Sequence, residues 1–471
     1  MRNNTSFNIG TLILIKKADR EFNFFDNIFG GLKGKAKHFI ESVKAFVNNR
    51  LDKCVSLSQI TQSYQREWFE CLGFKEIPKE RTLYRDLERI GEKYCFVVEK
   101  YQQLLKQKNL IDNKQFIDFS STYFEGNKAE LGSLGYSRDH EPGKKQITFG
   151  IETGINGVPT GLTIQKGNVQ DKKHMGFMIK IAGKVLEKGS LLIFDCGGNT
   201  EENKEKIIEL EFNYLTLKPR HRKIYKKYIG IYKKSQKEVI YVNSIKYKCV
   251  KVKDENVKYI FHSKNLYKKL RKNRNKKFQK ALLKGDKILA KVNKGKPIGE
   301  HISRRGNIIL KGEVQTSLSE IVNPYLTGLE GFFILESSVD EEPHKILKLY
   351  KNKDLAEKLI RNIKEGTELR PINHITKEAI IGYLVIVFLT NCLIQLTHFL
   401  NNDNVDKNLK LLKKKLNSLT LTFIYDKSLF RFSVLSNITD EIRKILGDSL
   451  KEFSEKQPDW IYNIQLSELD E

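Results

Sequence analysis

The order of secondary structure between residues 114 and 218 constrains the fold of this chain more than any other feature. Runs of apolar and β-branched residues predict strands, the turn residues of 154–157 predict a hairpin, and Thr200 is a good cap for the start of a helix. The expected order is three strands, a helix, a strand, a helix and a strand. The strands are 114–119, 146–152, 161–165, 191–195 and 212–218, and the helices are 171–186 and a helix that opens near Thr200.

This order describes an α/β fold with a ribonuclease H-like core. Asp118 lies on its first strand, and Asp195 ends its fourth strand after a fully apolar run. Each aspartate taken alone could be a cap or turn residue. Taken together, the two aspartates predict that each of two strands of the same core carries a single carboxylate at its end.

A third carboxylate lies on a predicted helix at 349–364, which contains no Pro or Gly and is rich in Leu, Lys, Glu and Ala. At about 100° per residue, its Tyr350, Lys353, Glu357 and Lys364 fall within roughly 60° of one another. A charged helix face is more often simply solvated. The two upstream aspartates favour a metal-dependent active site instead. A two-metal nuclease needs three carboxylates on separate elements of the fold.

The charge of the chain is unevenly distributed. The whole sequence has 84 Lys and Arg against 57 Asp and Glu, a net charge of +27. Residues 218–297 hold 28 Lys or Arg against 4 acidic residues, a difference of +24. Nucleic acid is the usual partner of such a segment. The alternative is a solvated lysine-rich surface, and the tyrosines that recur among these cations are either a backbone-gripping surface or core residues.

The 471 residues indicate about three domains, and changes in composition divide the chain into five segments. The helical N-terminal segment has a weak helix-turn-helix pattern over 56–65 and 80–106, for which a plain helical bundle is the alternative. The segments are a helical DNA-binding domain at 1–110, the first part of the core at 111–217, a basic β-rich insertion at 218–327, the second part of the core at 328–400, and a C-terminal region at 401–471 with a candidate role in dimerisation.

Within the insertion, short strands are expected at 239–242, 247–252, 259–262 and 307–310, with a very basic helix near 264–283. The run 331–336 is expected to return to the core as its last strand. A helical layer is expected over 372–401.

Two further patterns bear on location. The six cysteines contain no C-x-x-C pair, so neither a zinc site nor a disulfide framework is indicated, and a reducing cytoplasm is expected. The most apolar stretch, 380–400, is interrupted by Gly382, Asn391, Gln395 and His398, which favours a buried core helix over a membrane span. No membrane partner is expected.

The residues Tyr350, Lys353, Glu357 and Lys364 resemble a known signature. Their spacing is that of Tyr-x2-Arg-x3-Glu-x6-Lys in the insertion-sequence DDE transposases of bacteria and archaea, in the branch with a β-rich insertion between the second Asp and the Glu. Lys353 stands where the family has Arg, and Gly143 where it often has Asp. Other resembling pieces are 118–125, 135–142, 157–159, 167–171, 195–199, 202–203 and 369–371, and together they cover about 118–400.

The resemblance implies roles for these residues. Asp118 would bridge two Mg²⁺ ions, with Asp195 on one and Glu357 on the other, and Mn²⁺ is expected to substitute. Tyr350, Lys353 and Lys364 would bind DNA phosphates near the cleaved end. Because bound metal ions would lower the pKa of the nucleophile, neither His140 nor His174 is required as a catalytic residue.

The sequence therefore predicts a transposase. It would bind the terminal inverted repeats of its element, cleave the ends by two-metal hydrolysis, with hairpinned ends as one route, and join the 3′-hydroxyl to target DNA. The resemblance implies double-stranded DNA as partner, a synaptic homodimer and a cytoplasmic, nucleoid-associated location in a prokaryotic cell. The alternatives are a silent or repurposed DNA-binding protein and a metal-dependent nuclease without strand transfer.

Overall fold

The computed structural model describes residues 4–34, 36–292, 323, 325–400, 408–425 and 431–454. By their internal contacts they form two compact units. Unit 1 comprises Met1–Leu192, Glu205–Phe212 and Lys353–Glu471, and unit 2 comprises Ile193–Lys204 and Asn213–Asn352. The chain is a mixed α/β protein with a large sheet.

Three antiparallel strands carry the first predicted aspartate in unit 1. They are β2 (Lys114–Tyr123), β3 (Gln146–Gly154) and β4 (Pro159–Lys166), and Asp118 on β2 lies opposite Ile151 on β3. Helix α8 (Asp171–Val185) packs on β3 and β4. Because successive strand residues point to opposite faces, the Asp118 side chain lies on the other face from its neighbour Ile117.

The large sheet has nine strands in the order β4-β3-β2-β5-β6-β10-β9-β8-β7. Strand β5 (Leu191–Phe194) is followed by α9 (Glu201–Glu209), β6 (Asn213–Leu217) and, much later, β10 (Phe332–Ser337). Thr200 caps α9, since its hydroxyl accepts from the backbone N–H of Asn203. Every strand and helix predicted between residues 114 and 218 is confirmed to within a few residues.

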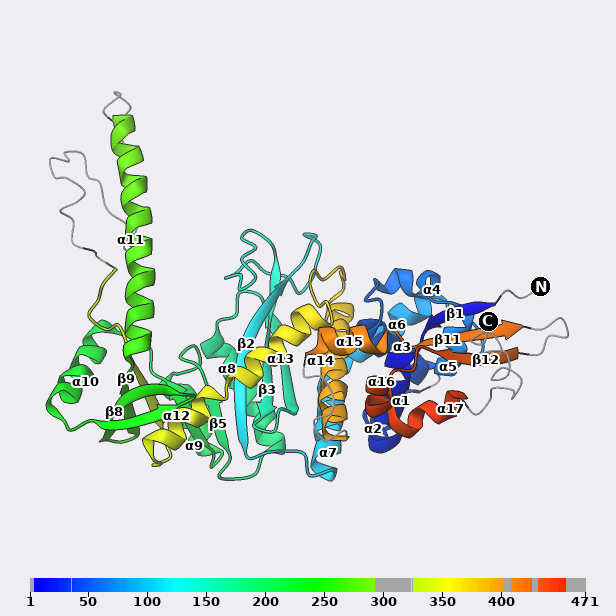
Figure 1. The fold of residues 1–471 in the computed structure, drawn as a ribbon, viewed down its shortest axis with the longest axis horizontal. Helices are drawn as coiled ribbons and strands as arrows, with labels where there is room; N and C mark the ends of the chain where they lie inside the picture. The colour runs from blue at the N-terminus through cyan, green and yellow to red at the C-terminus, as the bar shows by residue number, and fades with distance from the viewer. Residues whose placement is uncertain are drawn as a thin grey trace, which may run out of the picture. The chain divides into compact units, whose positions relative to one another are not determined.

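The basic insertion extends this sheet in unit 2. Strands β7 (Glu238–Val242), β8 (Ile245–Lys253) and β9 (Val257–His262) are antiparallel, and β9 pairs with β10, which in turn pairs with β6. Helix α11 (Lys264–Val292) is longer than predicted; it begins after β9 and extends away from β8 and β9 as the long green helix of Figure 1. The strand expected at 307–310 lies outside the described residues.

Helix α10 (Arg222–Lys234) was not predicted. Its buried side chains recur at the spacing of one helical face and pack against β8, β9 and β10. The core tyrosines of this helix are Tyr225, Tyr228 and Tyr232. For these three, and for the buried Tyr247 and Tyr259, core packing is the correct alternative, whereas Tyr241 is 58% exposed.

The N-terminal helices share one core with the long apolar helix α14 (Lys377–Leu400) in unit 1. α14 packs along α6 (Glu80–Glu92) and α3 (Phe39–Leu51), as Figure 1 shows. By length and composition α14 could cross a membrane, but 89% of its most apolar window is buried inside the protein. The prediction of a buried core helix is confirmed.

The two segments of the helix-turn-helix pattern differ from the prediction in detail. Residues 56–65 form a short 3₁₀ turn, Leu57–Gln59, and one turn of α4 (Ile60–Ser63). Residues 80–106 divide at Lys93 into α6 and α7 (Tyr94–Gln107). A DNA-binding role for this segment stays a prediction.

A second, three-stranded sheet of unit 1 joins a strand near the N-terminus to two strands from the C-terminal segment. Strand β1 (Thr5–Asn8) pairs with β11 (Thr420–Tyr425), which pairs with β12 (Arg431–Ser436). The helices of this part are α1 (Gly10–Phe22), α2 (Phe24–Phe29), α5 (Arg66–Leu72), α15 (Leu409–Leu416), α16 (Asp440–Leu446) and α17 (Lys451–Ser454). A role of the C-terminal segment in dimerisation stays a prediction.

Candidate active site

Two of the three predicted carboxylates meet at one lysine in unit 1. The Nζ atom of Lys353 lies 3.1 Å from Asp118 Oδ1 and 3.7 Å from Glu357 Oε1. The Lys353 side chain is 8% exposed, that of Asp118 20% and that of Glu357 56%. The structure therefore brings together a strand aspartate and a helix glutamate that are far apart in sequence.

The prediction of one continuous helix over 349–364 is wrong. The chain forms α12 (Pro343–Lys351), a turn at Asn352 and Lys353, α13 (Asp354–Arg361) and a π-helical turn, Asn362–Gly366. α12 packs on β6 and β7 of unit 2, whereas α13 packs on β2 and β3 of unit 1. The helix ends where the boundary between the units falls.

This break changes the expected arrangement of the signature residues. Tyr350 lies on α12, Lys353 in the turn, Glu357 on α13 and Lys364 on the π-helical turn. They do not share one face of one helix. Lys353 instead precedes the first turn of α13, where its carbonyl accepts the N–H of Ala356 and its side chain reaches Asp118 on the strand below.

The third predicted carboxylate, Asp195, belongs to unit 2. It follows β5, and its Oδ1 accepts the backbone N–H of Cys196 at 2.7 Å. The Tyr350 hydroxyl lies 3.4 Å from the same oxygen. The structure thus brings Asp195 and Tyr350 together in unit 2, and Asp118, Lys353 and Glu357 together in unit 1.

Lys364 is buried, and its ammonium lies 2.8 Å from Asp139 Oδ1. The guanidinium of Arg370 lies 2.6 Å from the same oxygen. Burial lowers the pKa of Lys364, and the carboxylate of Asp139 opposes that shift. A direct role of Lys364 on DNA stays a prediction, since its described partner is this carboxylate.

No role was predicted from the sequence for Asp139, which lies in the segment 135–142. Its side chain is 3% exposed, and it holds two cations that follow α13. The neighbouring Arg138 pairs with Asp171 at the start of α8, and its backbone N–H donates to Ser121 on β2. In the sequence, the only hint of these contacts is that Arg138 and Asp139 are adjacent residues of opposite charge. In the structure Arg138 pairs with Asp171, and Asp139 pairs with Lys364 and Arg370.

A divalent metal fits the chemistry of these residues. Hard cations take oxygen ligands, and the carboxylates of Asp118 and Glu357 already converge on a single positive charge. Among the residues that the structure describes, no group of three or more His, Cys, Asp or Glu side chains is close enough to hold a metal ion. The candidate metal-binding groups that lie close together in unit 1 are the carboxylates of Asp118 and Glu357.

Two titratable groups lie under the sheet, on the face covered by α8. Burial lowers the pKa of His174 to about 3, and its Nε2 lies 2.8 Å from the Thr163 hydroxyl. Burial raises the pKa of Glu152 to about 8, and the nearby Thr160 hydroxyl opposes that shift. His174 is therefore a neutral core residue at physiological pH.

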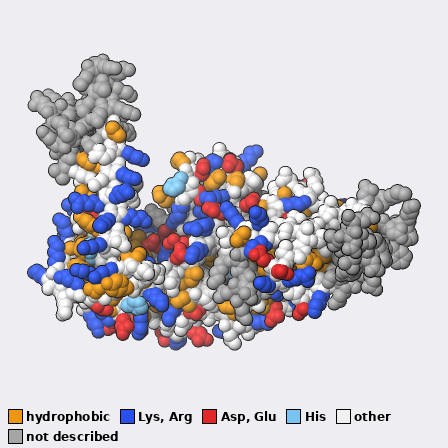
Figure 2. Space-filling view, viewed as in Figure 1, with side chains coloured by type: hydrophobic (Ala, Val, Ile, Leu, Met, Phe, Trp, Pro, Cys, Tyr) orange, Lys and Arg blue, Asp and Glu red, His pale blue; other side chains and the backbone are white. Residues whose placement is uncertain are grey.

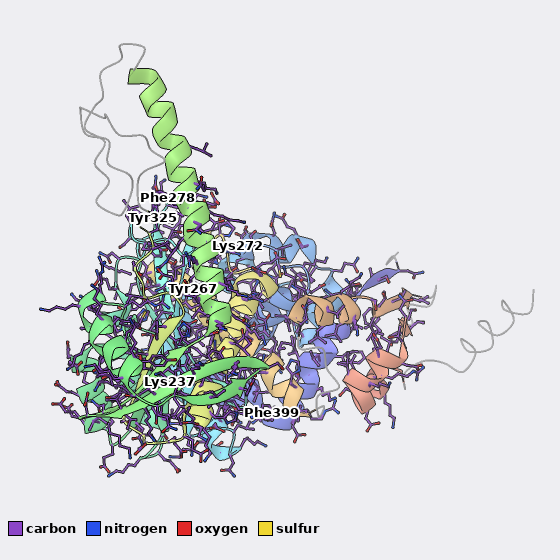
Figure 3. All side chains as sticks on the ribbon, turned by 60° about the vertical axis from the view of Figure 1, so that its left-hand side comes forward. Lys237, Tyr267, Lys272, Phe278, Tyr325 and Phe399 are labelled. Atoms are coloured by element: carbon purple, nitrogen blue, oxygen red, sulfur yellow. The ribbon has the colours of Figure 1, made fainter. Side chains whose placement is uncertain are left out.

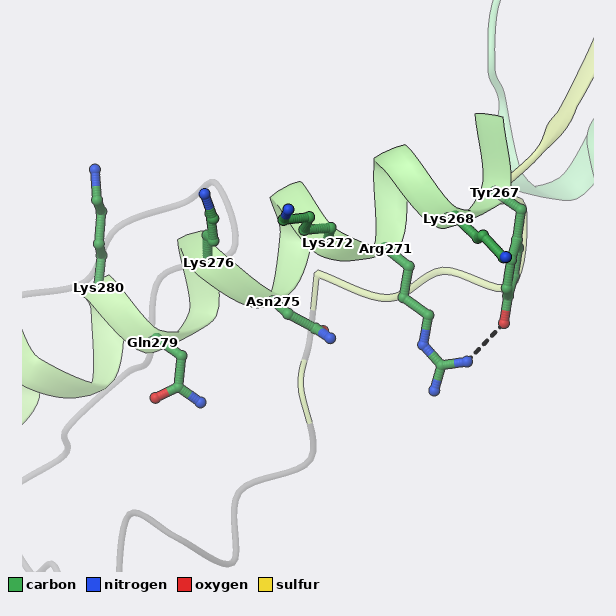
Figure 4. A pocket seen from close by; sticks show the side chains of 8 residues that line it. All are labelled: Tyr267, Lys268, Arg271, Lys272, Asn275, Lys276, Gln279 and Lys280. Atoms are coloured by element: carbon green, nitrogen blue, oxygen red, sulfur yellow. Dashed lines mark hydrogen bonds between the residues drawn. The ribbon is translucent and has the colours of Figure 1, made fainter. Parts of the chain in front are cut away.

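Helix α11 presents a strongly basic surface. Lys and Arg side chains gather along it in Figure 2, and Tyr267, Lys272 and Phe278 project from it in Figure 3. One side of the helix forms an open groove of about 690 Å³ (Figure 4), where Arg271 donates to the Tyr267 hydroxyl. The groove is lined by Tyr267, Lys268, Arg271, Lys272, Asn275, Lys276, Gln279 and Lys280.

Comparisons with known proteins add little to this geometry. No protein-family model matches the chain, and no curated protein matches it. Among solved structures it is similar to one described as the cryo-EM structure of piggyBac transposase synaptic complex with hairpin DNA. The identity is 11%, the TM-score 0.41, and the match covers 95% of this chain and 83% of that chain. A similarity of that size defines neither the fold nor the function of this chain.

Proposed function

We propose that this protein is a DNA transposase of the DDE type, with a ribonuclease H-like core and with Asp118, Asp195 and Glu357 as its catalytic carboxylates. The observation that carries the proposal is the meeting of Asp118 and Glu357 at the Lys353 ammonium. Two acids from a strand and a separate helix converge there, and Lys353 and Glu357 have the spacing of the Arg and Glu in the transposase signature. Glu357 reaches this ammonium through an i,i+4 pair, and Asp118 reaches it from β2.

The strand order supports the inclusion of Asp195. β5 neighbours β2 in the sheet, and the backbone N–H of Leu191, the first residue of β5, donates to the carbonyl of Asn113 just before β2. Asp118 is the fifth residue from Lys114, and Asp195 is the fifth from Leu191. The two candidate carboxylates therefore stand the same number of residues from the starts of two strands that are neighbours in the sheet order.

The order β4-β3-β2-β5-β6 also supports a ribonuclease H-like core. In it, three antiparallel strands are followed by α8, then β5 beside the first of them, then α9 and β6. The insertion between β6 and β10 carries most of the excess positive charge.

The metal-binding residues would be Asp118, Asp195 and Glu357, and Mg²⁺, or Mn²⁺ in its place, would supply Lewis acidity for the nucleophile and the leaving oxygen. The chain's own groups do the positioning. Before a metal binds, Lys353 brings positive charge to the carboxylates of Asp118 and Glu357, and the Tyr350 hydroxyl orients Asp195. The cations of α11 would hold the DNA backbone, which is how basic surfaces supply affinity that does not depend on sequence.

The test is strand cleavage by Glu357→Ala. The substrate is a plasmid that carries the inverted repeats flanking the coding region, incubated with Mg²⁺. We expect loss of cleavage with retained binding in a gel-shift assay. Asp354→Ala is the matched control: Asp354 lies on the same helix, is exposed and pairs with Lys358 at 2.7 Å, so that variant keeps cleavage.

Cleavage retained by Glu357→Ala would refute the catalytic role. Binding by the wild-type protein without cleavage in Mg²⁺ or Mn²⁺ would instead identify a repurposed DNA-binding protein. Cleavage without joining of 3′-ends to a second plasmid would identify a nuclease without strand transfer. The proposed synaptic homodimer is tested by measuring the mass of the complex of the protein with DNA of the transposon ends. We expect the mass of two protein chains and two DNA ends.

A further inference from the structure

Lys353 is poorly placed to bind DNA while it binds the two carboxylates. Its side chain is 8% exposed, and its ammonium lies 3.1 Å from Asp118 and 3.7 Å from Glu357. The same oxygens are the ones that a divalent cation would need. A lysine ammonium and a metal ion repel each other strongly at such distances in a poorly solvated site.

We propose that Lys353 is a resident counter-ion of the active site, which the first divalent cation displaces from Asp118 and Glu357. This inference rests on the proposed function. In the metal-free protein the ammonium neutralises two carboxylates that would otherwise repel each other. When the metal binds, Lys353 leaves the carboxylates and becomes available to a DNA phosphate, so metal loading and phosphate binding are coupled.

The local structure suits such an exchange. Lys353 lies in the turn between α12 and α13, just before the first turn of α13. Its flexible four-carbon stem carries a compact point charge, unlike the planar fork of an arginine. Glu357 is 56% exposed, so its carboxylate can turn from the ammonium toward a metal without unpacking the core.

The first experiment uses the wild-type protein, so folding of a variant is not in question. Lysines are acylated with a limiting amine-reactive reagent with and without saturating Mn²⁺, and the extent at each lysine is measured by mass spectrometry. We expect the acylation rate of Lys353 to rise by about fivefold or more with Mn²⁺, because its side chain leaves a position in which it is 8% exposed and its amine becomes accessible to the reagent. Lys358, which is 61% exposed and pairs with Asp354, is the internal reference and should not change.

The second experiment measures Mn²⁺ affinity by electron paramagnetic resonance. Lys353→Met keeps the length of the stem and removes the charge, and we expect it to bind Mn²⁺ about three- to tenfold more tightly than wild type. Lys358→Met should bind like wild type. Asp118→Asn should bind more weakly, which assigns the signal to this site.

The outcomes separate the inference from the proposed function. Mn²⁺ binding that depends on Asp118 but is unchanged or weaker in Lys353→Met, or a Lys353 acylation rate that Mn²⁺ leaves unchanged, would overturn the counter-ion role and leave the metal-dependent activity standing. Absence of Asp118-dependent Mn²⁺ binding in every variant, including with DNA, would overturn both.

Discussion

Asp139 is a buried carboxylate of unit 1, and Lys364 and Arg370 both pair with one of its oxygens. We predict that Asp139→Asn lowers the free energy of unfolding by about 2–4 kcal/mol, because it leaves the buried Lys364 without its counter-charge. Urea unfolding followed by circular dichroism measures this.

The control for Asp139 is Asp354→Asn, whose exposed pair with Lys358 should contribute less than about 1 kcal/mol. The double variant Asp139→Asn, Lys364→Met should recover part of the loss. Equal stability of Asp139→Asn and Asp354→Asn would contradict a structural role for the Asp139 pairs.

Glu152 makes stability depend on pH. Its pKa is raised by burial from 4.5 to about 8, so between these values the folded protein holds a proton that the unfolded chain releases. The contribution of Glu152 to stability therefore falls as pH rises from about 4.5 to about 8 and then levels off.

We predict that the difference in stability between Glu152→Gln and wild type changes in favour of the variant across that range, by on the order of 3–5 kcal/mol in total. Glutamine does not titrate, so any constant cost of burying its amide cancels when the difference is followed with pH. Thermal or urea unfolding at pH 5, 6, 7 and 8 measures the difference. A difference that does not vary with pH would show that Glu152 is ionised in the folded protein.

The candidate acidic residues could be named from local patterns, whereas the ion pairs of the cations could not. Asp118 and Asp195 each follow an apolar run; Asp195 follows the end of β5, but Asp118 lies inside β2 and not at the strand end that was expected. The partners of Lys353 and Lys364 could not be predicted from the sequence. Asp118 and Asp139 are far from these lysines in the chain and come close to them only in the folded protein.

At the scale of the elements, α6 and α14 cross at two glycines. A Cβ on Gly91 would lie 1.8 Å from the Glu378 carbonyl oxygen, and a Cβ on Gly382 would lie 2.1 Å from that of Leu87. We predict that Gly91→Ala lowers the free energy of unfolding by roughly 1–3 kcal/mol, because the two helix backbones must separate. Urea unfolding measures this loss.

Gly230→Ala on α10 is the matched control for Gly91→Ala. No atom lies within 4 Å of its added Cβ, and alanine favours a helix by about 1 kcal/mol over glycine, so this variant should be slightly more stable than wild type. A gain of stability in Gly91→Ala would show that the close helix crossing is not required.

The elements that the sequence predicted are those whose pattern is local. The strands and helices of 114–218 each have one apolar periodicity, and they are present. The prediction of one helix over 349–364 is wrong because the chain passes there from one unit to the other. The buried residues Ile346 and Leu347 of α12 belong to unit 2, and the buried residues Leu359 and Ile360 of α13 belong to unit 1. Residue propensity carries no information about that division.

Helix α10 shows the opposite case, a local signal that was present and was not recognised. Tyr225, Tyr228, Ile229 and Tyr232 follow helical spacing. From the sequence the tyrosines were left as either a backbone-gripping surface or core residues, and no helix was predicted over 222–234. A basic helix with an aromatic buried face satisfies both patterns at once.

At the scale of the whole molecule, we expect DNA affinity to depend on the basic insertion. We predict that replacing Lys268, Lys272 and Lys276 of α11 by Gln weakens DNA binding and reduces the slope of log Kd against log salt by about 2–3, close to 0.9 per lost phosphate contact. Fluorescence anisotropy between 50 and 300 mM salt, roughly the range over which counterion release is resolved, measures the slope.

The control for this triple variant replaces exposed lysines of unit 1, Lys184, Lys358 and Lys410, by Gln. It changes the net charge equally and should leave the slope near the wild-type value if α11 is the contact. An equal decrease in both triple variants would mean that the net charge of the chain, not α11, determines the affinity.

The proposed activity depends above all on Asp118, Asp195 and Glu357 binding one pair of divalent ions. Anomalous diffraction at the manganese edge from crystals grown with Mn²⁺ and DNA of the flanking inverted repeats locates such ions. We expect two peaks about 4 Å apart, with Asp118 contacting both and Asp195 and Glu357 contacting one each. Peaks elsewhere, or Asp195 without a metal shared with Asp118, would contradict the proposed site.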